Sequence, residues 1–89
     1  MDTTKKVSVT MRFIANVASA AGEDKTVFTI SSDIKLAIDD IHRYFTAKNA
    51  QDLLYTVLIN DRIYHQLIAE NYAIREGDRL TILPVTLGG

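Results

Sequence analysis

The chain ends in Glu76-Gly77-Asp78-Arg79-Leu80-Thr81-Ile82-Leu83-Pro84-Val85-Thr86-Leu87-Gly88-Gly89. Glu76-Gly77-Asp78 is a turn signal, because glycine reaches backbone angles that other residues avoid. Residues 79–85 are rich in β-forming side chains and predict the last strand. A tip of two glycines has no Cβ atoms and can pass through a narrow channel in another protein. We therefore expect residues 86–89 to form a flexible tail that carries the function.

Two strands are predicted near the start of the chain. From Lys6 to Phe13 apolar and polar residues alternate, which is typical of a strand with one buried face. Thr26 to Ile30 is rich in β-forming residues and predicts a second strand that pairs with the first as a hairpin. The residues between them, Asn16 to Lys25, are mostly small and polar, and we expect a connection there.

One amphipathic helix is predicted after the second strand. Asp33 is an N-cap candidate, because its carboxylate can accept hydrogen bonds from the first free amides of a helix. The apolar positions then recur every three or four residues and form a single stripe, consisting of Ile34, Ile38, Ile41 and Phe45 with Ala37 beside it. We expect the helix to end near Lys48.

The second half of the chain predicts further strands. Leu54 to Ile59 is apolar at both alternating sets of positions, as in an inner strand, and Asn60-Asp61 follows as a turn. Ile63-Tyr64 is short enough for a returning strand, while Gln66 to Tyr72 is ambiguous between a loop and a helical turn. The simplest arrangement is one α+β domain over residues 1–89, with the helix on one face of a mixed sheet and the last strand beside the first.

Composition narrows the classes of function. The chain has 89 residues, no cysteine and a formal net charge of −1, so disulfides, thiolate metal sites and a cysteine nucleophile are excluded. Interspersed charges argue against nucleic-acid or membrane partners, and no apolar stretch approaches the roughly 20 residues of a membrane helix. Only His42 and His65 could supply imidazole ligands, so we expect no metal site. We expect a soluble cytoplasmic protein.

Several segments together resemble the MoaD/ThiS sulfur-carrier proteins. They are Met11-Arg12-Phe13-Ile14-Ala15-Asn16, Ala20-Ala21-Gly22, Val57-Leu58-Ile59-Asn60-Asp61, the run from Tyr72 to Pro84, and Gly88-Gly89. The resemblance implies a ubiquitin-like β-grasp, in which a mixed sheet of four to five strands packs on one main helix. Pro84 stands alone where MoaD-type proteins usually carry two prolines. Asn60-Asp61 and Thr86-Leu87 are more similar to the ubiquitin-related modifier branch.

The resemblance also implies a chemistry for Gly89. An E1-like enzyme would join the Gly89 carboxylate to AMP, using ATP and Mg²⁺ that this chain does not itself bind. A protein persulfide would then supply sulfur, and the resulting thiocarboxylate would serve a larger acceptor enzyme such as the molybdopterin synthase large subunit. The chain contains no phosphate-binding glycine loop and no evident nucleophile–base pair, so we expect a carrier rather than an enzyme.

The residues before Gly89 have expected roles in reaching and docking. Four extended residues after Val85 span about 13–14 Å, so Thr86, Leu87 and Gly88 can thread the terminus into a partner. On the last strand Leu80 and Ile82 are expected to face the helix. Leu83 then lies on the opposite face beside Arg12 or Thr10. With Pro84 and Val85 it forms the expected docking patch.

Other functions remain open at the level of sequence. The same terminus could be conjugated to lysines as a ubiquitin-like modifier, or could donate sulfur for thiamine, tRNA or amino-acid biosynthesis. An inert β-grasp interaction module is a further alternative. Intact mass and lysine conjugates distinguish these possibilities.

Overall fold

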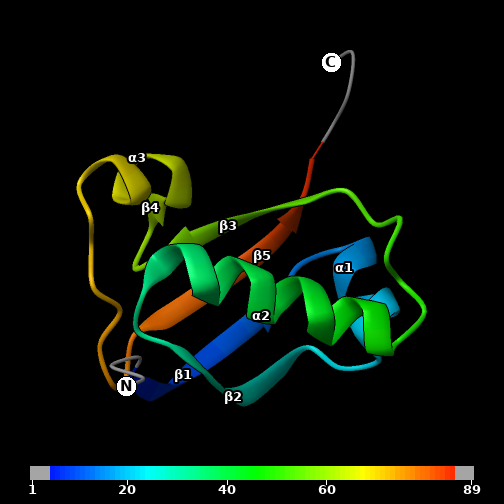
Figure 1. Ribbon diagram of the computed structural model, residues 1–89. Helices are drawn as coiled ribbons and strands as arrows, with labels where there is room; N and C mark the ends of the chain where they lie inside the picture. The colour runs from blue at the N-terminus through cyan, green and yellow to red at the C-terminus, as the bar shows by residue number, and fades with distance from the viewer. Residues whose placement is uncertain (1–4, 86–89) are drawn as a thin grey trace.

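A five-stranded mixed sheet organises residues 5–85, which are the residues described in a computed structural model (Figure 1). The strands lie in the order β2-β1-β5-β3-β4; β1 and β5 are parallel and the other neighbours are antiparallel. The elements are β1 (Lys6–Phe13), α1 (Asn16–Ala21), β2 (Lys25–Ser31), α2 (Ile34–Ala47), β3 (Tyr55–Ile59), β4 (Arg62–Ile63), α3 (Tyr64–Ala69) and β5 (Arg79–Pro84).

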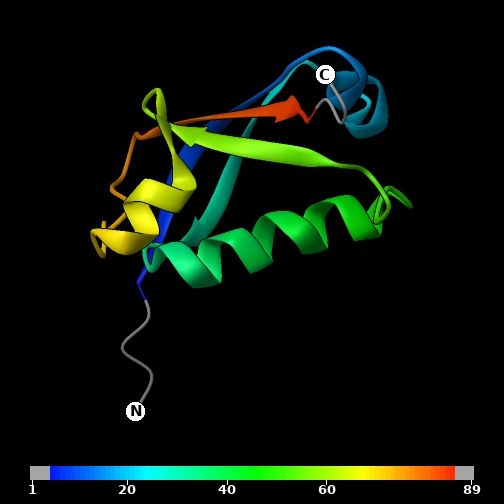
Figure 2. The ribbon, with the colours of Figure 1, turned by 90° about the horizontal axis from the view of Figure 1, so that it is seen from above.

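The core lies between α2 and one face of the sheet, as Figure 2 shows from above. The predicted stripe is confirmed, although Ile38 lies at its edge and is only half-buried. Alternate residues of the strands meet this stripe, so the core is continuous from β1 to β3. Its main members are Val7, Val9, Met11, Phe13, Ile30, Ile34, Ala37, Ile41, Phe45, Val57, Ile59, Leu80 and Ile82.

The predicted connection between the first two strands was partly wrong. Residues 16–21 form the short helix α1, which buries Val17 and Ala21 against β1 and β5. These two residues are one helical turn apart, so a single turn brings both to the core. Gly22 ends the helix at φ 80°, a left-handed conformation that suits glycine. Two apolar residues are too few to produce a visible period.

The remaining boundaries are close to those predicted. The Asp33 carboxylate accepts hydrogen bonds from the backbone amides of Lys35 and Leu36, so Asp33 is the N-cap of α2. The ambiguous segment after β4 is helical from Tyr64 to Ala69, and the returning strand is Arg62–Ile63. The Asn60-Asp61 turn is confirmed, because both residues have positive φ angles of 50° and 70°.

A buried carboxylate joins the two turns at the start of β5. Asp78 is 9% exposed and accepts hydrogen bonds from Asn60 Nδ2 (3.0 Å), the Tyr72 hydroxyl (2.7 Å) and the Arg75 backbone amide (2.9 Å). The side-chain oxygen of Asn60 in turn accepts the backbone amide of Arg79 at 3.0 Å. The turn after β3 and the loop after α3 are therefore fixed to the first residue of β5.

The ionisation of Asp78 is coupled to this network. Burial by itself would raise the pKa of the Asp78 carboxyl, but the hydrogen bonds from Arg75, Asn60 and Tyr72 together outweigh it and lower the pKa below its ordinary value. The pKa of the Tyr72 hydroxyl is raised, first by burial and then by its bond to Asp78. The native state therefore favours ionised Asp78 and neutral Tyr72.

Replacing the carboxylate tests whether the network is a stabilising element. Asp78→Asn should lower the free energy of unfolding by about 1–3 kcal/mol at pH 7, because buried donors lose a charged acceptor. The native pKa is depressed, so this stabilisation is complete above the unfolded pKa and is lost as the pH falls through the native pKa. Urea unfolding from pH 7 down to about pH 2 should therefore show the two proteins converging in acid.

Asp61 provides the matched control for this experiment. It is an exposed aspartate in the adjoining turn, and asparagine also tolerates its positive φ. Asp61→Asn should change stability by less than about 0.5 kcal/mol. Two results would contradict this role of Asp78. One is an equal loss of unfolding free energy in both variants. The other is a difference in unfolding free energy between wild type and Asp78→Asn that stays constant at every pH.

Candidate functional site

The backbone that leads to the predicted tail is held in place through Val85. β5 lies between β1 and β3, and the Ile14 amide donates to the Ile82 carbonyl at 3.0 Å. The Val85 amide donates to the Leu54 carbonyl at 3.3 Å, so pairing with the chain before β3 continues past Pro84. The predicted reaching residues Thr86, Leu87 and Gly88, and the predicted reactive residue Gly89, lie outside the described residues.

The predicted division of β5 between two faces is confirmed. Leu80 and Ile82 are fully buried beneath α2, whereas Arg79, Thr81 and Leu83 share the face that points away from α2. We call this second surface the open face. The predicted neighbours of Leu83 on β1 were wrong. Thr10 pairs with Arg79 and Arg12 pairs with Thr81, so both lie nearer the start of β5 than Leu83 does.

Leu83 lies instead at the end of the sheet where β5 leaves it. Its cross-strand partner is Thr56 of β3, and Ile14 follows the last paired residue of β1 on its other side. The sequence could not give this register, because parallel strands can pair with any stagger that keeps the same faces buried. Leu83 and Pro84 are both half-buried, and Val85 is 39% exposed.

The open face carries more apolar side chains than the three predicted for docking. Leu58 and Ile63 are paired across β3 and β4 on the open face, and Leu54 lies opposite Val85 by the alternation of the strands. Ile14, Leu54 and Ile63 are 40%, 54% and 37% exposed. A sequence signal for Leu54 and Leu58 was available. Residues 54–59 carry apolar side chains on both faces of the strand, so some of them had to lie on the face away from the helix.

Cationic side chains occupy the middle of the open face. Arg12 and Arg79 are exposed on adjacent strands, and Lys25 is paired with Arg12 across β1 and β2. A shallow hollow of about 580 Å³ is lined by these three cations and by one carboxylate, that of Asp24. The open face thus combines an apolar end, where the chain leaves β5, with a cationic centre.

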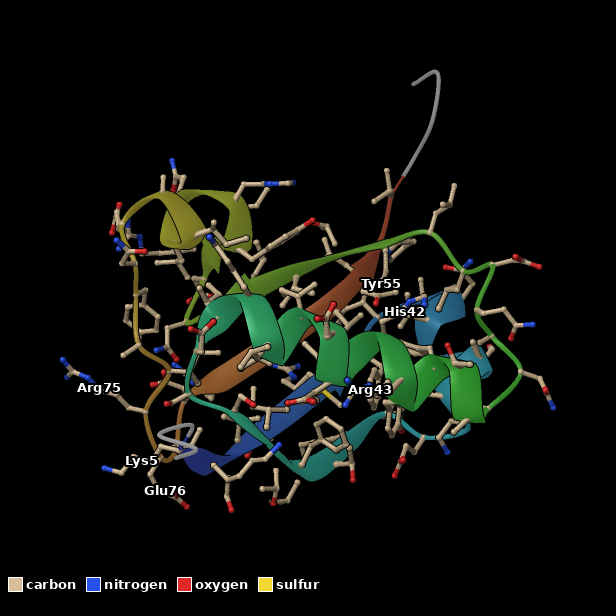
Figure 3. The ribbon with its side chains drawn as sticks, viewed as in Figure 1. Lys5, His42, Arg43, Tyr55, Arg75 and Glu76 are labelled. Carbon is tan, nitrogen blue, oxygen red and sulfur yellow. The ribbon has the colours of Figure 1, made fainter. Side chains whose placement is uncertain are left out.

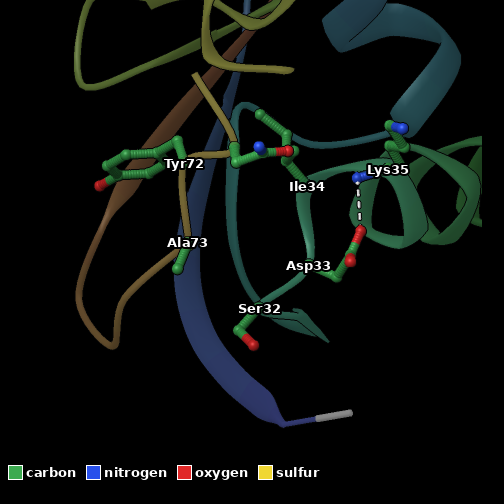
Figure 4. Close-up of a pocket in the computed structure, with 7 residues that line it drawn as sticks. Ser32, Asp33, Ile34, Lys35, Tyr72 and Ala73 are labelled. Carbon is green, nitrogen blue, oxygen red and sulfur yellow. Dashed lines mark hydrogen bonds between the residues drawn. The ribbon is translucent and has the colours of Figure 1, made fainter. Parts of the chain in front are cut away.

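A second hollow, at the start of α2, shows no reactive site. It lies where the start of α2 meets the loop after α3, has a volume of about 360 Å³, and is lined by Ser32, Asp33 and Tyr72 among others (Figure 4). The one carboxylate in its lining, that of Asp33, is already bonded to the amides of α2. The lining also includes Lys35 and Tyr72, whose hydroxyl donates to Asp78, so the hollow offers no unbonded carboxylate that could act as a base.

The two histidines lie on different helices and form no metal site within the described residues. His42 lies on α2 (Figure 3) and His65 on α3, and both are exposed. Residues 5–85 contain no group of three His, Cys, Asp or Glu side chains that could hold a metal. No helix within the same residues is long and apolar enough to cross a membrane. Asp40 on α2 is half-buried, and its carboxylate accepts the Ser31 backbone amide at 3.0 Å.

Comparison with known proteins identifies the fold. No protein-family model matches the sequence, and neither does any curated protein. Among solved structures, small archaeal modifier protein 1 from Methanosarcina acetivorans is similar, with a TM-score of 0.71 and 17% identity over 96% of this chain and 99% of that one. The HVO 2177 protein from Haloferax volcanii has a TM-score of 0.70 and 22% identity, over 100% of this chain and 92% of that one.

A third similar structure comes from Pyrococcus furiosus. It belongs to a protein proposed to be molybdopterin converting factor subunit 1, with a TM-score of 0.68 and 14% identity over 90% of this chain and 99% of that one. At these identities the likeness establishes the architecture. The chain has the ubiquitin-like β-grasp fold, as the resemblance in its sequence predicted.

Proposed function

We propose that this chain is a sulfur carrier, whose folded body presents the Gly89 carboxylate to an activating enzyme. The observation that supports the proposal most strongly is the course of β5. This strand is held on both sides as far as Ile82, stays paired with the chain before β3 as far as Val85, and leaves the sheet beside an exposed apolar surface. The ubiquitin-like fold and the sequence Gly88-Gly89 add to this support.

The Gly89 carboxylate is by itself a poor electrophile. A terminal carboxyl has a reference pKa of about 3.3–3.7 and is ionised at neutral pH, so it resists attack until it is activated. An E1-like enzyme would join it to the α-phosphate of ATP, with Mg²⁺ as cofactor and pyrophosphate as leaving group. A protein persulfide would then displace AMP. A thiol would cleave the resulting sulfur–sulfur bond and leave the thiocarboxylate on Gly89.

The open face is proposed as the docking surface for this activation. Leu83, Pro84 and Val85 lie where the tail begins, and the exposed Ile14 and Leu54 extend the apolar area around them. Burying such side chains on a partner is favourable at about 25 cal/mol per Å². The exposed arginines beside this area favour a partner surface that carries carboxylates around an apolar centre. The acceptor enzyme, such as a molybdopterin synthase large subunit, would use the same face in turn.

Conjugation to lysine is the second candidate function. It would need the same activated Gly89, with an amine in place of the persulfide as nucleophile. The observation that favours it is the likeness to structures named small archaeal modifier protein 1, from two archaeal species. In both candidates the chain supplies the acyl group while its partners supply the catalysis.

Sulfur loading can be measured on the chain itself. Intact-mass analysis of protein purified from its native host should show a fraction heavier by the difference between sulfur and oxygen, because the thiocarboxylate replaces one carboxylate oxygen. Adding one alanine after Gly89 should abolish this fraction while leaving the fold intact. Lysine-linked conjugates without any sulfur-bearing species would favour the modifier. If neither the sulfur-bearing species nor the lysine conjugates are found, both candidate functions are contradicted.

A charge placed on the docking surface tests how the partner approaches. Leu83→Glu should reduce the sulfur-loaded fraction by about tenfold or more, because an apolar contact becomes a buried charge beside the tail. Leu36→Glu is the matched control: Leu36 is 42% exposed and lies on α2, which covers the opposite face of the sheet. Loading that is unchanged in Leu83→Glu, or reduced equally in the control, would refute docking at this face.

A further inference from the structure

Three cationic side chains lie next to one another on the open face, one on each of three adjacent strands. Lys25 on β2 is directly opposite Arg12 on β1. Arg79 on β5 is paired with Thr10, which precedes Arg12 by two residues. Adjacent strands are about 4.8 Å apart, so the cations form an oblique row across β2, β1 and β5 (Figure 1). We call Lys25, Arg12 and Arg79 the cation row.

The cation row is an electrostatically unfavourable arrangement. Like charges that lie directly opposite each other on neighbouring strands destabilise a sheet, and all three side chains of the row are exposed. The ion pairs among residues 5–85 involve the cations of Lys6, Arg43 and Arg62, and none of them includes a member of the row. The repulsion is therefore not relieved by an ion pair within the described chain, and a bound anion would relieve it.

Hydroxyl groups and two hollows surround the cation row. Arg12 is paired with Thr81, so Thr81 and Thr10 alternate with the two arginines on β1 and β5. Both threonines are half-buried, and their hydroxyls bond to no other group of residues 5–85. The arginines line two hollows, one of about 580 Å³ toward β2 and one of about 160 Å³ toward the turn after β3. A ligand on the row would therefore meet hydroxyl donors as well as cations.

The spacing of the row favours an anion that is longer than a single phosphate group. The outer strands of the row, β2 and β5, are about 10 Å apart, which is twice the distance between neighbouring strands. A chain of linked phosphates can contact all three cations where they stand, whereas a single phosphate would require the side chains to converge. The whole chain has a formal net charge of −1, which opposes a long polyanion such as nucleic acid.

We propose that the cation row binds a short condensed phosphate, either free or as the triphosphate of a nucleotide. The two arginines would donate to oxygens of the phosphate chain, and Lys25 would contact one end of it. The hydroxyls of Thr10 and Thr81 would donate to oxygens between the arginines. The carboxylates of Asp24 and Asp61 each line one of the two hollows and would oppose the anion, which limits its affinity.

A titration with condensed phosphate tests the site without sulfur loading or an activating enzyme. Sodium tripolyphosphate, added to the full chain at constant pH and ionic strength, should shift the NMR amide signals of Arg12, Lys25 and Thr81. The amide signal of Ile41 in α2 should stay unchanged. Orthophosphate should bind about tenfold more weakly, because it carries fewer charges and reaches fewer cations. Tighter binding of ATP than of tripolyphosphate would identify a nucleotide as the ligand, and equal or weaker binding of ATP a free phosphate chain.

Matched substitutions separate the site from the net charge of the chain. Arg12→Gln and Arg79→Gln should each weaken the binding of tripolyphosphate by about tenfold, because each removes a charged donor to phosphate. Lys35→Gln is the control: Lys35 is exposed on α2, which covers the opposite face of the sheet, and its loss should change binding by less than about twofold. Asp61→Asn should strengthen binding by about twofold to threefold, because it removes an opposing charge.

Three results would overturn the proposal. They are the absence of shifts at millimolar tripolyphosphate, an equal loss of binding in Lys35→Gln and the arginine variants, and orthophosphate binding as tight as that of tripolyphosphate. None of them would bear on the Gly89 carboxylate, so the sulfur-carrier proposal stands or fails separately.

Discussion

The buried carboxylate of Asp78 is the interaction on which the arrangement of this molecule depends. It accepts three hydrogen bonds from two separate turns, and β5 begins at the next residue. Because β5 is flanked by β1 and β3, fixing its start also fixes its register against both neighbours and the place where the chain leaves the sheet. The point at which the chain leaves β5 therefore depends on a polar contact at the opposite end of the strand.

The two faces of the sheet differ in what they contribute: one forms the core and the other is exposed. One face packs on α2 and contains nearly all the fully buried side chains, so substitutions there act through the core. The open face combines exposed apolar residues with Arg12 and Arg79. The edge of β2 is a third surface, where the amides of Val27 and Thr29 have no partner within residues 5–85 and a groove lies beside them. A carrier of the proposed kind, which would meet an activating enzyme and an acceptor in turn, would benefit from surfaces that can change without loss of the fold.

Much of this architecture could be predicted from the sequence, because the signals were local and repeated. The alternation in residues 6–13 and the stripe of α2 each follow from one period, and the Asn60-Asp61 turn from residue type. Helix α1 and the neighbours of Leu83 could not be predicted in the same way. Val17 and Ala21 are too few to show a period, and the stagger between β1 and β5 depends on contacts distant in sequence. The bonds of Asp78 and Asp40 are likewise tertiary.

The central claim is that the folded body presents an acyl terminus that another enzyme activates. The most direct measurement is ATP–pyrophosphate exchange by the activating enzyme of the same cell, with and without this chain. The account predicts exchange that requires the chain and disappears when Gly89 is deleted. Exchange that never depends on the chain, or that persists without Gly89, would contradict it.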